Sequence, residues 1–202
     1  MIRIVNLIRW PAELGAVVGM GEMTRRFLAD AFAGESQAHM RYLIFAEKAE
    51  NEGFPNVARL FRAIAYAEKV HAENHYSKLR DLNVEAKVVA GAPFGPGTTS
   101  KNLEMSIRGE EFEVNEMYPA YMEIAKLQGE RAAELSFRWA YEAEKTHAQL
   151  YRIAKEYVDK GEDWPIEGNI WVCPVCGHTH VGAAPPDKCP ICGVSGESFA
   201  KF

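Results

Sequence analysis

Two copies of one short motif carry the residues best suited to chemistry. Glu68 is followed three positions later by His71, and Glu144 is followed in the same way by His147. The surrounding hexapeptides are also alike, AEKVHA in the first copy and AEKTHA in the second. Residues three apart share one face of a helix, so each motif can offer a carboxylate and an imidazole to one point. Such oxygen and nitrogen ligands suit iron or manganese.

Further glutamates occur at matching places ahead of these motifs. Gly34-Glu35 recurs as Gly109-Glu110, and Glu113 follows Glu110 after one helical turn. All lie on apolar stripes with helical spacing, so they are predicted to face a core. Ionised carboxylates are costly to bury unless cations neutralise them. Two divalent ions come close to neutralising five glutamates, which predicts a dinuclear site.

Other polar residues occur on or near the same stripes. Tyr42 and Tyr118 are predicted to orient carboxylates by donating hydrogen bonds to them. His39 and His75 have no matched partner, so we predict packed or solvated histidines at these positions. The two Glu-x-x-His copies are thus the stronger indication of a site, because a repeat rarely arises by chance.

The last thirty residues contain all of the cysteines, as two C-x2-C pairs: Cys173, Cys176, Cys189 and Cys192. This spacing predicts one tetrahedral thiolate site, whose metal supplies much of the folding free energy of so short a segment. The spacing fits zinc as well as iron. Trp171 and the nearby two-metal site favour iron, and zinc stays open.

Four helices must position the bundle ligands. Apolar residues recur at threes and fours over 24–51, 55–82, 101–127 and 130–158, with a kink predicted at Pro119. The glycines and prolines of 83–100 indicate a long crossover. Four helices with one long connection match a ferritin-like bundle. We therefore predict an N-terminal extension at 1–21, an all-α four-helix bundle at 22–160 and a small metal domain at 166–202.

The composition of the chain bears on two classes of binding partner, nucleic acids and membranes. The chain has 202 residues, of which 48% are hydrophobic and 25% charged, with a formal net charge of -5. No basic cluster favours nucleic acid. The apolar start is interrupted by charged residues and Pro11 and has no clear cleavage site, so we expect no membrane span and a cytoplasmic protein.

From about Phe27 to Phe202 the sequence resembles the rubrerythrin family. The likeness is carried by AGESQA at 33–38, by both Glu-x-x-His motifs, by GEEFE at 109–113 followed by MYP at 117–119, and by the cysteine-rich tail. The resemblance implies a ferritin-like di-iron bundle followed by a rubredoxin-like domain. The first twenty residues are additional to the family pattern.

The resemblance also implies catalytic roles for seven metal ligands: Glu35, Glu68, His71, Glu110, Glu113, Glu144 and His147. Glu68 and Glu144 bridge the two irons in this scheme. Glu35 binds the first iron, with Glu113 and His71 as alternative ligands that exchange when the oxidation state changes. Glu110 and His147 bind the second iron.

The implied activity is that of a non-haem di-iron peroxidase that reduces hydrogen peroxide to water and protects against oxidative stress. Electrons enter through the four-cysteine iron, from a redox partner such as rubredoxin or a NAD(P)H-dependent reductase. The main alternative is a ferroxidase or iron-storage protein, which has little use for an electron-donating tail. A structural or sensor protein with zinc in the tail is a further alternative.

A homodimer is also expected, since a tail tethered after residues 161–163 can reach the bundle of another subunit more easily than its own. The crossover could also exchange helix pairs between chains. Sequence alone leaves both expectations open.

Overall fold

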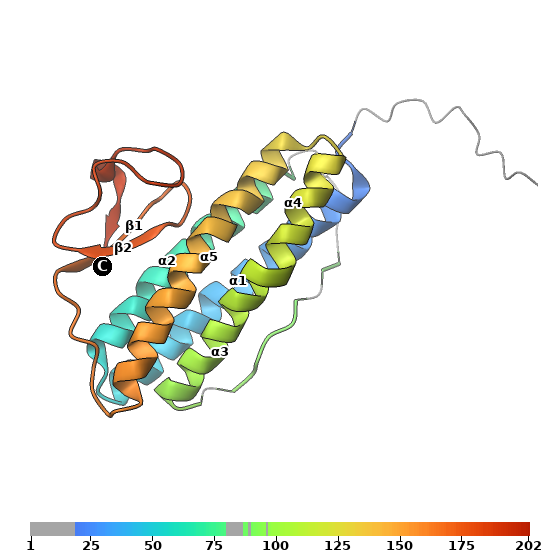
Figure 1. The fold of residues 1–202 in the computed structure, drawn as a ribbon. Helices are drawn as coiled ribbons and strands as arrows, with labels where there is room; N and C mark the ends of the chain where they lie inside the picture. Colours follow the sequence, from blue (N-terminus) through green and yellow to red (C-terminus); the bar gives the residue numbers. More distant parts are fainter. Residues whose placement is uncertain (1–18, 80–86, 89, 96) are drawn as a thin grey trace, which may run out of the picture.

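The computed structural model describes residues 19–79, 87–88, 90–95 and 97–202 (Figure 1). The predicted N-terminal extension, 1–21, lies almost entirely outside these ranges. Part of the predicted crossover and the predicted helix end at Leu82 also lie outside them.

In the described residues, four helical rods form a bundle (Figure 1). The rods are α1 (Glu22–Asn51), α2 (Pro55–Ser77), a third rod made of α3 (Thr99–Phe112), η1 (Glu113–Met117) and α4 (Tyr118–Leu127), and α5 (Arg131–Val158). Helix α1 packs along α2, and the third rod packs along α5. The chain turns between rods at Gly53 and Gly129, whose φ angles of 86° and 75° favour glycine.

The third rod is interrupted where the sequence predicted a proline kink, but the irregularity precedes Pro119. Residues Glu113–Met117 form a π-helix, whose turn holds one more residue than an α-helical turn. Glu35 and Tyr42 are seven positions apart, whereas Glu110 and Tyr118 are eight apart. The π-helix accommodates this extra residue, so both tyrosines point into the core, 2% and 0% exposed.

The apolar interior is divided by a layer of buried polar residues. On one side of this layer the core includes Phe45, Phe61 and Tyr151. On the other side it includes Leu28 and Phe137. The four glutamates of the layer are buried at 0–2% exposure: Glu35, Glu68, Glu110 and Glu144. Apolar packing above and below therefore fixes the helices that carry them.

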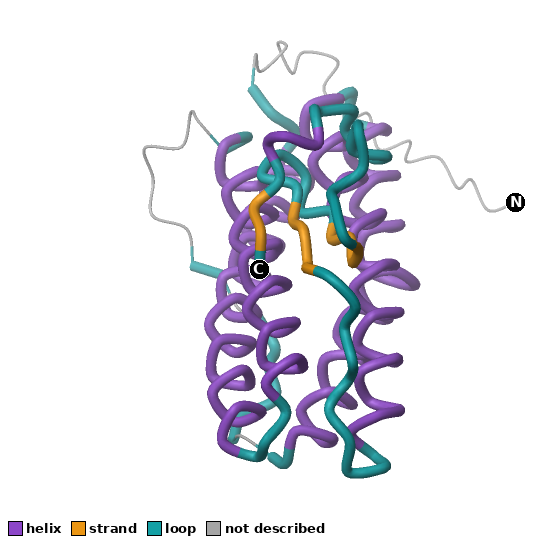
Figure 2. Tube along the Cα trace, turned by 90° about the vertical axis from the view of Figure 1, so that its left-hand side faces the viewer, coloured by secondary structure: helices purple, strands orange, loops and turns teal. Residues whose placement is uncertain are grey.

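The tail is a small antiparallel sheet of β1 (Asn169–Val172), β2 (Thr179–Gly182) and β3 (Ala200–Lys201), in the order β2-β1-β3. A short 3₁₀ turn, η2 (Gly196–Ser198), precedes β3. The sheet lies beside α2 and α5 of its own chain (Figures 1 and 2). Our reason for expecting a dimer, that the tail reaches another subunit more easily, is therefore not supported by this arrangement.

The linker into the tail is fastened to the bundle. Asp163 accepts hydrogen bonds from the backbone N–H groups of Asn56 (2.9 Å) and Val57 (3.2 Å) at the start of α2. These are N–H groups that a helix leaves without internal partners, and a carboxylate there is also favoured by the helix dipole. Asn74 of α2 donates a further bond to the carbonyl oxygen of Val175 (2.8 Å). The tail is thus held at both its linker and its first cysteine loop.

Candidate metal centres

The buried polar layer contains two overlapping groups of possible metal ligands. In each group, one ligand atom from every residue lies within 4.8 Å of the others. The first group is Glu35, Glu68, His71 and Glu144, and the second is Glu68, Glu110, Glu144 and His147. Glu68 and Glu144 belong to both groups, so the arrangement suits two metal ions that share two carboxylates.

Both histidines turn the same ring nitrogen toward this layer. Nδ1 of His71 lies 3.0 Å from Glu68 Oε2 and 2.7 Å from Glu144 Oε1. Nδ1 of His147 lies 2.6 Å from Glu144 Oε2. A metal ligand must present a bare nitrogen, so Nδ1 is the coordinating atom available at each position.

The other ring nitrogen of each histidine bonds to the tail. Nε2 of His71 donates to the carbonyl oxygen of Cys176 (3.1 Å), and Nε2 of His147 lies 2.9 Å from Oγ1 of Thr179. The Thr179 hydroxyl donates to the carbonyl oxygen of Gly177, so it accepts from His147. These bonds place an N–H on Nε2, so Nδ1 is the nitrogen that can bind a metal once it carries no proton.

Two buried tyrosines orient the outer glutamates. The Tyr118 hydroxyl donates to Oε1 of Glu35, and the Tyr42 hydroxyl donates to Oε1 of Glu110 at 2.7 Å. Each tyrosine thus serves the glutamate of the opposite half of the repeat. One oxygen of each carboxylate is held in place, and the second remains for another partner.

The chemistry of this donor set fits a pair of metal ions. Among the described residues, two buried carboxylate oxygens have no hydrogen-bond partner, Oε2 of Glu35 and Oε1 of Glu68, while Oε1 of Glu144 faces Nδ1 of His71 at 2.7 Å. Leaving such atoms buried without a partner is costly. Two cations would satisfy all of them.

The buried carboxyl and imidazole groups change one another's pKa. Burial, followed by repulsion from neighbouring carboxylates, raises the pKa of Glu35 and of Glu110 well above the usual range. Burial acts the same way on Glu144, but attraction to His71 and His147 lowers its pKa. For His147, burial opposes the charged form, yet Glu144 raises the pKa to about 9. The outer carboxyl groups therefore favour holding a proton, whose place a bound cation would take.

The predicted ligand Glu113 lies beside these groups and belongs to neither. It is half-buried in η1 and lines a surface hollow with Met117 and Tyr121. Burial and the charge of Glu144 raise the pKa of its carboxyl group. The structure therefore brings six of the seven predicted ligands together and leaves Glu113 at the edge.

The four cysteines form the second centre. The sulfur atoms lie within 4.8 Å of one another, with Cys173 and Cys192 at 3.5 Å and Cys176 and Cys189 at 3.4 Å. All four are free thiols. A tetrahedral set of four thiolates suits a single zinc or iron ion.

The first cysteine loop lies against the bundle at Gly177. Its φ angle is 77°, and a Cβ atom added there would lie 2.2 Å from Nε2 of His71. Glycine is therefore required both by the backbone conformation and by the contact with His71.

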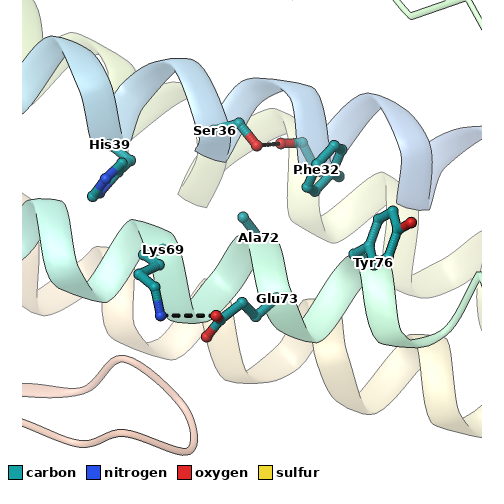
Figure 3. Close-up of a pocket in the computed structure, with 7 residues that line it drawn as sticks. All are labelled: Phe32, Ser36, His39, Lys69, Ala72, Glu73 and Tyr76. Atoms are coloured by element: carbon teal, nitrogen blue, oxygen red, sulfur yellow. Dashed lines mark hydrogen bonds and ion pairs between the residues drawn. The ribbon is translucent and has the colours of Figure 1, made fainter.

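His39 lies away from the centre, in a hollow between α1 and α2 (Figure 3). Its Nδ1 donates to the carbonyl oxygen of Ala65 at 2.6 Å. The hollow is lined by Phe32, Ser36, His39, Lys69, Ala72, Glu73 and Tyr76. Its one carboxylate, Glu73, is paired with Lys69 (Figure 3). Nothing in this hollow bears on the metal groups.

His75 is a polar residue whose setting the sequence pattern did not reveal. It is fully buried, and its ring contacts Ser136 and Tyr118 through hydrogen bonds. Burial lowers its pKa to about 3, so the ring is neutral. Its position one helical turn after His71 was the available indication, because residues four apart share a helix face.

The helical rods and the buried shared carboxylates together define a ferritin-like dinuclear carboxylate protein. Comparison with known proteins narrows this class. The family model described as Rubrerythrin matches residues 26–155, and the model for the rubredoxin-like domain of rubrerythrin matches 171–200. The chain belongs to the rubrerythrin family, whose members are generally oxidoreductases.

Individual relatives agree. The chain is 47% identical over 180 residues to rubrerythrin-2 of Clostridium acetobutylicum, covering 89% of this chain and 97% of the relative. It is 33% identical over 175 residues to nigerythrin of Nitratidesulfovibrio vulgaris, covering 87% and 84%. The solved structure of fully reduced, all-ferrous nigerythrin superimposes with a TM-score of 0.79 at 31% identity, covering 94% of this chain and 91% of that one.

These findings confirm three predictions made from the sequence: the family, the ferritin-like fold with a rubredoxin-like tail, and the pairing of a di-iron carboxylate site with a four-cysteine site. None of the described helices is long and apolar enough to cross a membrane.

Proposed function

We propose that this protein is a peroxidase that reduces hydrogen peroxide to water at the di-iron site, with electrons arriving through the four-cysteine iron. The observation that carries the proposal is the hydrogen bond from Nε2 of His71 to the carbonyl oxygen of Cys176, at 3.1 Å. It joins a candidate ligand of one metal centre to the backbone of a candidate ligand of the other. Storage of iron has no need of such a connection.

The ligand assignment is part of the proposal. Glu68 and Glu144 would be shared by the two irons, which their membership of both ligand groups supports. Glu35 and His71 would hold the first iron, and Glu110 and His147 would hold the second. Glu113 would be an alternative to His71 as a ligand of the first iron, and its place at the edge of the layer supports this role.

When bound, the iron pair supplies two electrons to the O–O bond of peroxide. The residues of the chain would hold the metals, orient the ligands and shield them from water. Tyr42 and Tyr118 each hold one oxygen of an outer glutamate, so that the second oxygen keeps its direction. The tail covers His71 and His147, both at most 1% exposed, and so keeps water from them.

The protein's wider setting is also proposed here. The matched family models, over 26–155 and 171–200, support the division into a 22–160 bundle and a 166–202 tail. We further propose a cytoplasmic homodimer that draws electrons from rubredoxin or a NAD(P)H-dependent reductase.

A stopped-flow experiment tests the peroxidase proposal against the ferroxidase alternative. The fully reduced protein is mixed without oxygen with hydrogen peroxide and, separately, with dioxygen, while the visible absorbance of the ferric-thiolate centre is followed. We expect rapid return of colour with peroxide and slow return with dioxygen. Faster reaction with dioxygen would favour a ferroxidase, and a colourless protein would indicate zinc in the tail.

A further inference from the structure

The two halves of the internal repeat differ in the residue next to each orienting tyrosine. Glu68 and Glu144 are 76 positions apart, and so are Tyr42 and Tyr118. The same offset relates His75 to Tyr151. Equivalent positions in the two halves are therefore occupied by a histidine and a tyrosine.

The two residues behave differently toward the tyrosine beside them. Nε2 of His75 lies 3.1 Å from the hydroxyl oxygen of Tyr118. The ring of Tyr151 packs edge-on against Tyr42, with ring centres 5.4 Å apart, and its buried hydroxyl has no hydrogen-bond partner among the described residues. Tyr118 is thus supported by a hydrogen bond from behind, whereas Tyr42 is supported only by packing.

The hydrogen bonds through His75 run in one direction. The single hydroxyl proton of Tyr118 is given to Glu35, so the Tyr118 oxygen can only accept from His75. The proton of the neutral His75 ring is therefore on Nε2. Nδ1 is then bare and accepts from the hydroxyl of Ser136 at 2.9 Å. All four residues are at most 2% exposed, so water does not compete for these bonds.

We propose that His75 is a positioning residue that acts on one metal only, the one held by Glu35, by strengthening the hydrogen bond from Tyr118 to Glu35. The proposal rests on the assignment of Glu35 and Glu110 as ligands to different metals. Its consequence is that the two irons are electronically unequal, although their glutamates occupy equivalent places in the repeat.

The physical basis is cooperativity between hydrogen bonds. A hydroxyl that accepts a bond becomes a better donor, and the effect is larger in a low-dielectric interior. A carboxylate that accepts a stronger bond gives less electron density to its metal. A ferric ion is stabilised by negatively charged ligands more than a ferrous ion is. Weaker donation by the Glu35 carboxylate therefore makes the iron on Glu35 the easier of the two to reduce.

The first test needs no metal and no activity. Nitrogen-15 NMR of the metal-free full-length protein distinguishes the two tautomers of His75. We expect a proton on Nε2 and a bare Nδ1, with the Nε2–H signal moving in Tyr118→Phe and unchanged in Tyr151→Phe. A proton on Nδ1 would overturn the proposal.

The second test compares matched variants of the iron-loaded protein by redox titration of the bundle, followed by Mössbauer spectroscopy. His75→Phe should shift one of the two midpoint potentials to a lower value and change one ferric signal. Tyr151→Phe should change neither, and His75→Gln should restore the wild-type values, because its amide can donate to Tyr118.

Equal shifts in both potentials with His75→Phe, or no shift in either, would contradict the proposal. These readouts do not depend on peroxide as substrate. A protein that fails the stopped-flow test could therefore still show the expected tautomer and potentials, and the two proposals can fail separately.

Discussion

Nε2 of His71 donates to the carbonyl oxygen of Cys176, 3.1 Å away, and a Cβ atom on the next residue, Gly177, would lie 2.2 Å from the same nitrogen. The imidazole of His71 therefore lies between the two centres, because it presents Nδ1 to the carboxylate layer and Nε2 to the cysteine loop.

Gly177→Ala should separate the two centres without emptying them. The added methyl group cannot coexist with His71 in its present position, so the loop must move. Electron transfer from the tail to the bundle should slow in single-turnover stopped-flow, while iron analysis shows both centres filled.

Gly193→Ala is the matched control for this substitution. Gly193 has nearly the same φ angle, 78°, but an added Cβ there meets nothing within 4 Å. Both variants should lose about 1–2 kcal/mol of stability to the left-handed backbone conformation. An equal slowing in both would show that the contact with His71 does not matter.

Removing a shared carboxylate should abolish the activity. Glu68→Ala or Glu144→Ala takes a ligand from both metals, and peroxide turnover should fall at least ~100-fold, beyond the effect typical of losing a supporting residue. Glu111→Ala is the control, because Glu111 is partly exposed and pairs with Arg152. Normal turnover with both irons retained in Glu68→Ala would refute the ligand assignment.

Cys173→Ser should disconnect the bundle from its reductant. The bundle keeps its iron, because no bundle ligand is changed, but repeated turnover with a reductant that works through the tail should stop. A single turnover of the chemically reduced protein should remain. Undiminished steady-state turnover in Cys173→Ser would exclude the tail as the electron entry point.

Chelation of the tail metal should unfold the 166–202 segment, since metal binding supplies its folding free energy. The helical circular dichroism signal of the bundle should be kept.

Glu52 should stabilise the bundle above acid pH only. Its carboxylate accepts the backbone N–H of Thr99 at 2.7 Å, at the start of α3, and pairs with Lys48. Although burial opposes it, these bonds lower the pKa from 4.5 to about 2. Because the folded-state pKa is depressed, the stabilisation is fully present above about pH 4.5 and is lost as pH falls toward 2.

Glu52→Gln should therefore cost about 1 kcal/mol in urea unfolding at neutral pH, and the difference from the unsubstituted protein should vanish near the lower pKa. Glu50→Gln is the control, since Glu50 is half exposed and contacts Arg62 instead. A pH-independent difference would assign the effect of Glu52 to packing.

The bundle could be predicted from the sequence because its apolar residues and metal ligands recur with helical spacing. Glu68 and His71 share a helix face with the apolar residues around them, so the fold that buries those residues must bring the ligands together. The π-helix is also indicated by the sequence, because Tyr118 lies eight positions after Glu110 whereas Tyr42 lies seven positions after Glu35. The sequence instead predicts a kink at Pro119, because proline is a common cause of helix kinks.

Contacts between the tail and the bundle cannot be predicted from local sequence patterns. Gly177 reads as an ordinary glycine of a cysteine loop, and its approach to His71 depends on how the tail docks. Asp163 likewise reads as a linker residue, although it caps α2. The sequence predicts a packed or solvated His75 because it has no matched partner in the repeat, and its contacts with Ser136 and Tyr118 join segments far apart in the chain. Each of these needs three-dimensional placement that no local pattern encodes.

The two outward-facing imidazole N–H groups also link the docking of the tail to the metal ligands of the bundle. Nε2 of His71 and Nε2 of His147 bond to Cys176 and Thr179, which belong to the metal-binding tail. Without a docked tail, neither imidazole would have these partners to hold its N–H on Nε2. Docking of the tail therefore also fixes which nitrogen of each histidine faces the carboxylate layer.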